Sequence, residues 1–344
     1  MTEYQIIEQT PTEKKKDFEL IKEKNFLQYI GSKRKLLSKI TSYIEGELIV
    51  DLMAGTHSLG FFLKDKKQIL ANDVMKYSYI IGKAILESSI LELEPLDIKS
   101  NSNYTFFQDH YSGTYFTQEQ CQDFDALKFS IESLKNKHLK ACYYSCVFNI
   151  MDRVGTTAGH FDGFLKKSTQ KAQRRKNKKV LKYFQKEVKQ FKNKKNKYDS
   201  EVYNLKDTDF LKQIEKVDTI YIDPPYNHRQ YSTLYHIPEM FVRYSGELKD
   251  CLYQYPKDRY FSPYCYKTKA KTAFDELIEL SARKTDHVVF SYSNKGLVPV
   301  KALMKIFKKH FKTLKKMEIP YYHRQQKTSR GSGMVKELIF SMHN

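Results

Sequence analysis

Short apolar runs alternate along this chain with longer stretches in which apolar residues recur at helical spacing. Such alternation is typical of α/β proteins with a mostly parallel sheet. We predict seven strands, at Leu48–Leu52, Gln68–Ala71, Glu201–Leu205, Thr219–Ile222, His287–Tyr292, Leu314–Tyr321 and Val335–Met342. The last two flank a basic, Gly-containing loop, so we expect them to form an antiparallel pair that closes the sheet.

Between Asp73 and Glu201 the pattern becomes helical, as in Gln118–Lys137 and His138–Val154. A helical block of this length inside an alternating pattern predicts an inserted domain. We therefore divide the chain into a flexible N-terminal arm (1–25), a main α/β domain (26–74 and 199–344) and a helical insert (75–198).

The charge is concentrated in two segments. The chain has 344 residues and a net charge of +20, of which residues 166–197 contribute +14 and residues 301–336 contribute +10. A localised basic excess is typical of proteins that bind a polyanion, and nucleic acid is the partner we expect. The first segment also contains Tyr183, Phe184 and Phe191, which we interpret as part of a polyanion-facing helix; a solvated lysine-rich surface is the alternative.

Other features of the composition narrow the class of protein. No apolar run approaches the roughly 20 residues needed to cross a bilayer, and no signal-peptide core is present, so we expect a cytoplasmic protein. The five cysteines show no disulfide framework. His138, Cys142 and Cys146 share one helix face, but without a fourth ligand we favour core packing and predict no metal.

The segment LIVDLMAGTHSLGFF predicts a strand, a turn of small residues and a helix. Asp51 ends the strand, and Ala54, Gly55 and Thr56 form the turn, which lets a ligand approach the backbone at the carboxyl end of the strand. Asp73 follows eighteen residues after Gly55, a spacing that suits hydrogen bonds to ribose hydroxyls. This pattern predicts a nucleoside-binding unit.

The segment TIYIDPPYN indicates catalysis on a planar amino group. Its strand delivers Asp223 to the carboxyl end, and Pro224 and Pro225 then fix the loop ahead of Tyr226. Two acceptors, the Asp223 carboxylate and the Pro224 carbonyl, can grip the amino hydrogens and free the nitrogen lone pair for attack. Stacking on Tyr226 is worth about 1 to 3 kcal/mol per base, which offsets part of the energy of flipping a base out of a duplex.

Four segments, QYIGSKRKLL (28–37), DLMAGTHSLG (51–60), AND (71–73) and IDPPYN (222–227), occur in an order that resembles the Dam-like class of DNA N6-adenine methyltransferases, which use S-adenosylmethionine. NHRQYSTLYH, FSYSN and the closing stretch from Arg324 to Phe340 are also similar to that family. The resemblance implies a Rossmann-like methyltransferase sheet whose helical insert recognises the target in double-stranded DNA.

The resemblance also implies roles for single residues. Asp223, Pro224, Pro225 and Tyr226 would be catalytic, and the cofactor would be bound by Tyr29, Gly31, Ser32, Lys33, Asp51, Ala54, Gly55, Thr56, Asp73 and Asp207. Asp209 is a rival to Asp207. His57 and Met53 stand where the family usually has Gly and Phe.

For DNA we expect phosphate contacts from a basic helix over Lys166–Lys197 and further contacts near the catalytic loop. The residues we predict to bind DNA are Arg153, Lys166, Lys167, Arg174, Arg175, Lys178, Arg229 and Tyr231. The DNA target sequence would be recognised by the loop 151–166, with His160 and Asp162, or by the tyrosine-rich segment Tyr244–Tyr266. The latter segment equally fits a surface loop packed by its own aromatic residues.

Other functions stay open. Methylation of cytosine N4 or of RNA would use a similar loop, although Asp at its head favours adenine; cytosine C5 chemistry would need a Pro-Cys pair, which the chain lacks. A non-catalytic DNA-binding subunit would be expected to lose the acidic residues, and all of them are present. A cognate restriction endonuclease is a possible partner.

Overall fold

The computed structural model describes residues 3–8, 27, 29–166, 168–320 and 335–344. Within them, eight strands form one sheet in the order β1-β7-β8-β6-β5-β2-β3-β4. Neighbouring strands run parallel, except that β8 is antiparallel to β6 and β7. The strands are β1 (Glu3–Glu8), β2 (Leu48–Asp51), β3 (Gln68–Asn72), β4 (Glu201–Tyr203), β5 (Thr219–Ile222), β6 (His287–Ser293), β7 (Thr313–Pro320) and β8 (Lys336–His343). The predicted α/β class and the antiparallel pairing of the last two strands are confirmed, although β1 lies outside this pair at the edge of the sheet.

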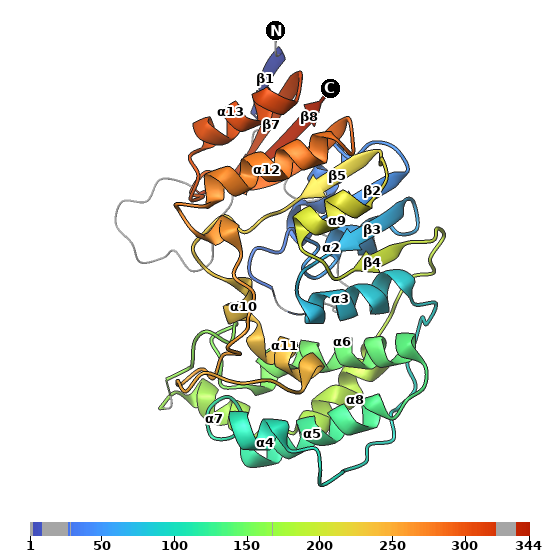
Figure 1. The fold of residues 1–344 in the computed structure, drawn as a ribbon. Coiled ribbons are helices and arrows are strands. Elements are labelled where there is room, and N and C mark those ends of the chain that lie inside the picture. Colours follow the sequence, from blue (N-terminus) through green and yellow to red (C-terminus); the bar gives the residue numbers. More distant parts are fainter. Residues whose placement is uncertain (1–2, 9–26, 28, 167, 321–334) are drawn as a thin grey trace.

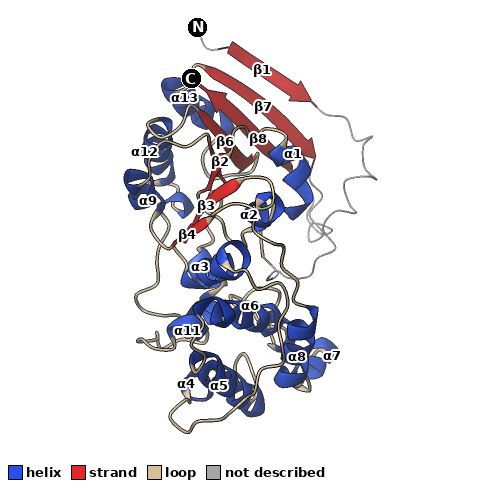
Figure 2. Ribbon diagram, turned by 90° about the vertical axis from the view of Figure 1, so that its right-hand side faces the viewer, coloured by secondary structure: helices blue, strands red, loops and turns tan. Residues whose placement is uncertain are grey.

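Helices cover both faces of the sheet (Figure 2). One face packs against α9 (Asp207–Gln213), α12 (Ala270–Ala282) and α13 (Val300–His310), which share an apolar core with β5 and β6. On the other side lie α1 (Leu37–Thr41), α2 (Ser58–Leu63) and α3 (Lys76–Gly82), the last continued by a short π-helix, Lys83–Glu87. No helix in the described ranges is both long enough and apolar enough to cross a membrane.

A layer of further helices extends beyond α3, at the end of the molecule away from β1 (Figure 1). It contains α4 (Phe106–Tyr111), α5 (Gln118–Glu132), α6 (Lys137–Val154), α7 (Gln170–Lys176) and α8 (Val180–Gln190). After β5 the chain returns to this layer through α10 (Tyr231–Leu234) and α11 (His236–Arg243), and α11 packs on α3 and α6. The helical layer therefore draws on two separate parts of the sequence, whereas we expected it only from residues 75–198.

Local sequence explains most element boundaries. All four residues of β5 are buried, and the two prolines after it prevent a helix from starting at once. Thr117 and Gln120 form a capping box at the start of α5. The Asn136 side chain accepts hydrogen bonds from the backbone of His138 and Leu139 and so caps the start of α6.

Two expectations about elements were wrong. We predicted no strand before Leu48, but residues 3–8 form β1, which pairs with β7 at the sheet edge. The basic segment is not one helix but two, because the chain turns between α7 and α8; the Gln120 amide holds this turn by donating to the carbonyls of Arg175 and Lys178. The predicted loop before β8 lies outside the described residues.

Core positions also differ from the sequence interpretation. Phe184 and Phe191 are buried in the core, so they do not face a polyanion. Phe184 belongs to the buried side of α8, Phe191 follows the last residue of that helix, and the opposite side of α8 presents lysines. Core packing is confirmed for Cys142 and Cys146 but is wrong for His138, which is exposed in the first turn of α6.

Candidate active site

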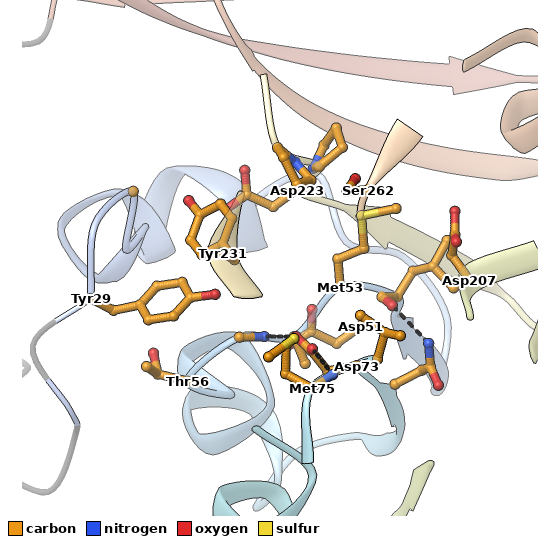
Figure 3. A pocket seen from close by; sticks show the side chains of 18 of the residues that line it. Tyr29, Asp51, Met53, Thr56, Asp73, Met75, Asp207, Asp223, Tyr231 and Ser262 are labelled. Atoms are coloured by element: carbon orange, nitrogen blue, oxygen red, sulfur yellow. Dashed lines mark hydrogen bonds between the residues drawn. The ribbon is translucent and has the colours of Figure 1, made fainter. Parts of the chain in front are cut away.

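A cavity opens at the carboxyl ends of β2, β3 and β5. Parallel strands end together at this edge, so acids that follow different strands are brought close. Figure 3 shows Asp51, Asp73 and Asp223 around this one cavity. The wall includes every residue that we predicted to be catalytic or cofactor-binding: Tyr29, Gly31, Ser32, Lys33, Asp51, Ala54, Gly55, Thr56, Asp73, Asp207, Asp223, Pro224, Pro225 and Tyr226.

The turn after β2 is fastened to Asp73. One Asp73 carboxylate oxygen accepts from the backbone N–H of Gly55 at 2.8 Å, and the other accepts from that of Met75 at 2.8 Å. Gly55 has φ of 54°, and a Cβ there would lie 3.1 Å from the Tyr29 ring. The turn therefore needs glycine both for its left-handed backbone and for the close approach of Tyr29.

His57 supports this turn from beneath. It has φ of 55°, the conformation in which glycine is favoured. Its ring is fully buried, and Nε2 lies 2.8 Å from the Ser78 carbonyl, while a Cβ on Gly82 would come within 2.5 Å of the ring. Burial lowers the pKa of His57 to about 4, so the imidazole is neutral. The side chain packs behind the cavity and is not part of its wall.

The cavity holds several buried carboxyl groups. Burial, with smaller contributions from Asp223 and Asp73, raises the pKa of Asp51 to about 8. Burial also raises the pKa of Asp73 and of Asp207, although the Tyr264 hydroxyl donates to the Asp207 carboxylate. Ionising these buried acids costs free energy in the free protein. A cationic ligand would stabilise their ionised form, so the cavity favours a ligand with a positive charge.

Asp223 stands at the end of β5 with Lys33 as its partner. The Lys33 ammonium lies 2.9 Å from the Asp223 carboxylate and donates to the Gly31 carbonyl at 3.1 Å. Burial raises the pKa of Asp223, and Lys33 opposes that rise. The Tyr226 ring packs edge-on against Tyr292 with centroids 5.8 Å apart. An acceptor and an aromatic face thus border one cavity.

Stacked tyrosines form another side of the cavity. Tyr29 stacks on Tyr231 with ring centroids 5.1 Å apart and on Tyr235 at 4.7 Å. The Tyr231 hydroxyl donates to the Ile30 carbonyl at 3.0 Å, and the Ile30 N–H donates to the Tyr235 hydroxyl at 2.7 Å. Tyr231, which we predicted to bind DNA, therefore belongs to the cavity wall.

Comparison with known proteins decides the family. A profile of the D12 class of N6 adenine-specific DNA methyltransferases matches residues 29–306, which is most of the chain. The chain belongs to this family. The match spans the cavity residues from Tyr29 to Tyr264 and confirms the family that the sequence motifs resemble.

Individual relatives agree with the family. The chain is 29% identical to Type II methyltransferase M.FokI of Planomicrobium okeanokoites and 28% identical to Modification methylase StsI of Streptococcus sanguinis, over 91% of its length in each case. It covers 52% and 51% of those two proteins, so it spans about half their length. It is 30% identical to Type II methyltransferase M.NlaIII of Neisseria lactamica, over 82% of the chain and 88% of that protein.

The cations that we predicted to contact DNA fall into two groups. Lys166, Arg174 and Arg229 are exposed, and Lys167 lies outside the described residues. Arg153 pairs with the buried Glu187, and Lys178 donates to the Arg153 carbonyl at 2.7 Å.

Arg175 is buried and is a correction to our prediction. Its guanidinium donates to the carbonyls of Asp152, Gly155 and Thr157. Because these bonds already occupy it, we withdraw Arg175 as a phosphate contact. Its place on the buried side of α7, five residues before the apolar start of α8, is the sequence signal that could have revealed this.

Sequence reasoning also missed part of the cavity. Gln230, Tyr260, Ser262 and Tyr264 line it from the segment after the acidic loop. Glu337, at the start of β8, accepts from the Tyr226 hydroxyl at 3.3 Å. An acid within the otherwise apolar run ELIF was the available signal for Glu337.

Proposed function

We propose that this chain transfers a methyl group from S-adenosylmethionine to N6 of adenine in double-stranded DNA, as a site-specific, adenine-specific DNA methyltransferase. The observation that supports the proposal best is that Asp223, Pro224 and Tyr226 border the same cavity as the buried acids Asp51 and Asp73. Methyl transfer requires that the loop that holds the amino group and the cofactor site border the same cavity, because the reacting atoms have to come within about 3 to 3.5 Å of each other.

The donor set fits the cofactor. Asp51, Asp73 and Asp207 supply acceptors for a cation, hydroxyls and an amino group, and the turn at Gly55 borders the same cavity. Lys33, Gly31 and Ser32 would complete the cofactor site on the side of the acidic loop. When bound, S-adenosylmethionine supplies an electrophilic methyl group on a positively charged sulfur.

The chain's own residues would perform the remaining tasks. Tyr226 would stack on the extruded adenine, which is worth about 1 to 3 kcal/mol. The Asp223 carboxylate and the Pro224 carbonyl would accept the two amino hydrogens and so localise the nitrogen lone pair. One such positioned polar group typically changes a rate by about 10²- to 10³-fold.

We propose that the DNA contacts come from two segments that pack together. Phe164 of the loop after α6 stacks on Tyr253 with centroids 5.2 Å apart, and the Tyr255 hydroxyl donates to Asp162. His160 lies in the same loop. Burial lowers the pKa of its imidazole, and the nearby charge of Arg229 lowers it further. This unit would read bases, whereas Lys166 and Arg174 would contact phosphates.

For the domain division, we propose a catalytic part formed by residues 26–74 and 199–344 and a target-recognition part formed by residues 75–198. The packing of α11 on α3 and α6 supports adding the segment Tyr231–Tyr266 to the target-recognition part. We further propose that the protein modifies the DNA site of a cognate restriction endonuclease, by analogy with relatives named type II methyltransferases.

The decisive experiment is expression in a host that lacks adenine methylation, followed by long-read mapping of modified bases. We expect N6-methyladenine at one short sequence motif, and no modification from a matched Asp223→Ala variant. Modification at cytosine N4, or at RNA alone, would contradict the proposal. Soluble wild-type protein that binds DNA but leaves it unmodified would favour a non-catalytic binding subunit.

A further inference from the structure

Glu337 is a buried acid that the proposed chemistry has not yet used. It begins the buried part of β8 and is 5% exposed. One carboxylate oxygen accepts from the Tyr226 hydroxyl at 3.3 Å. The other oxygen lies 3.8 Å from the Lys33 ammonium and, among the described residues, has no hydrogen-bond partner. Burying a carboxylate oxygen without a hydrogen-bond partner lowers the stability of the folded protein, which suggests a functional role for Glu337.

Lys33 connects Glu337 to the acidic loop. The same ammonium is 2.9 Å from Asp223 and 3.8 Å from Glu337, so two carboxylates share one cation. If Glu337 carried no charge, Lys33 would be attracted to Asp223 alone. Asp223 would then be a weaker acceptor for the hydrogens of a substrate amino group, because its negative charge would be more fully neutralised.

The surroundings of Glu337 hold few other charges. In register beside it are Ser293 of β6 and Ile319 of β7. The groups that face its carboxylate are Lys33, Asp223 and Tyr226. The neighbouring acid Glu318 pairs with Lys316 and Lys336 and is in register with Leu338, so strand alternation directs it to the other face of the sheet.

We propose that Glu337 is a positioning residue for methyl transfer: it fixes the Tyr226 ring through the phenol hydroxyl and shares the Lys33 ammonium with Asp223, so that Lys33 neutralises the Asp223 charge only in part. This inference rests on the proposed function, since it concerns the same cavity. Glu337 itself would touch neither the base nor the cofactor. Its charge and its hydrogen bond act through Tyr226 and Lys33.

The first test is Glu337→Gln, which keeps the shape and an acceptor for Tyr226 but removes the charge. We expect kcat on a DNA duplex to fall about tenfold or more, with KM for S-adenosylmethionine changed less than about threefold, since the loss is felt in the transition state. The matched control is Glu318→Gln, an acid one position away along the paired strands but facing the opposite side. It should leave both constants unchanged.

A pH profile separates positioning from loosened structure. Removal of the Glu337 charge takes a like charge away from Asp223, so the pKa of Asp223 falls. We therefore expect the acidic limb of the profile of kcat/KM to move to lower pH in Glu337→Gln by about half a unit or more. A variant that merely loosens the fold loses activity at every pH without moving this limb.

The outcomes are distinguishable. Wild-type protein that methylates no DNA would overturn the proposed function itself. Active wild type with an unchanged kcat and pH limb in Glu337→Gln would overturn the role of Glu337 alone. Should Glu337→Gln fail to fold, Tyr226→Phe is the second test, because it removes only the hydroxyl group that donates to Glu337. We expect Tyr226→Phe to lower kcat. Full activity of that variant would contradict the inference.

Discussion

The cavity at the strand ends and the basic segment 166–197 both concentrate charge, but they hold it in opposite ways. In the cavity each charged group has fixed partners, such as Lys33 beside Asp223 or Asp73 on two backbone N–H groups. Among the described residues of the basic segment, most cations are exposed and Arg175 alone is buried. A buried charge requires specific partners and so has a defined position, whereas exposed charges act mainly through their number.

The largest expected effect lies in the cavity. Asp223→Ala removes the acceptor for the amino hydrogens, and we expect methyl transfer to fall by about 10³-fold or more. Salt-sensitive DNA binding should persist, because the exposed cations are elsewhere. Methyl incorporation and electrophoretic mobility shifts, measured on the same preparations, check both parts. Retained turnover would remove Asp223 from the catalytic set.

The second prediction concerns a buried cation in the basic segment. Arg175→Ala leaves the carbonyls of Asp152, Gly155 and Thr157 without their donor. We expect the free energy of unfolding to fall by about 2 to 4 kcal/mol. Arg174→Ala, one residue earlier and exposed, is the matched control and should unfold like the wild type in denaturant titrations. Equal stability of the two variants would refute the structural role of Arg175.

The third prediction uses the titration of Asp51. Its pKa of about 8 means that the free protein holds Asp51 protonated at neutral pH. A cationic ligand favours the ionised form, so binding releases a proton and affinity for S-adenosylmethionine should rise with pH, by up to about tenfold per unit below pH 8, and should level off above pH 8.

Calorimetry across this pH range measures the effect. S-adenosylhomocysteine, which has no sulfonium charge, should show a shallower rise, and Asp51→Asn should flatten the curve. Identical slopes for the two ligands would show that Asp51 does not sense the ligand's charge.

The smallest effect is expected for single exposed cations. Lys166→Gln should reduce the slope of log affinity against log salt by about 0.9, the value for one lost phosphate contact. Methyl transfer at saturating DNA should not change. Fluorescence anisotropy over a salt series measures the slope. An unaltered slope would place Lys166 outside the DNA interface and would leave Arg174 and Arg229 as the exposed cations to test next.

The sequence by itself determined the strands from β2 to β8 and the residues that meet at their carboxyl ends. These features are local, because apolar periodicity defines each strand and the two prolines of the DPPY segment fix the loop that follows β5. Parallel pairing then brings Asp51, Asp73 and Asp223 to one edge whatever the details of packing. The other predicted site residues, such as Tyr29, Lys33 and Asp207, came from the resemblance to the methyltransferase family, and all fourteen predicted catalytic and cofactor residues line the cavity.

Only the tertiary structure decided which charges are buried and what they contact. Arg174 and Arg175 are neighbours in a uniformly basic run, yet one is exposed and the other binds three carbonyls. Glu337 meets Tyr226 across 111 residues of chain. Such contacts depend on how distant segments pack, and the free energy of burying a charge is set by those partners rather than by its neighbours in sequence.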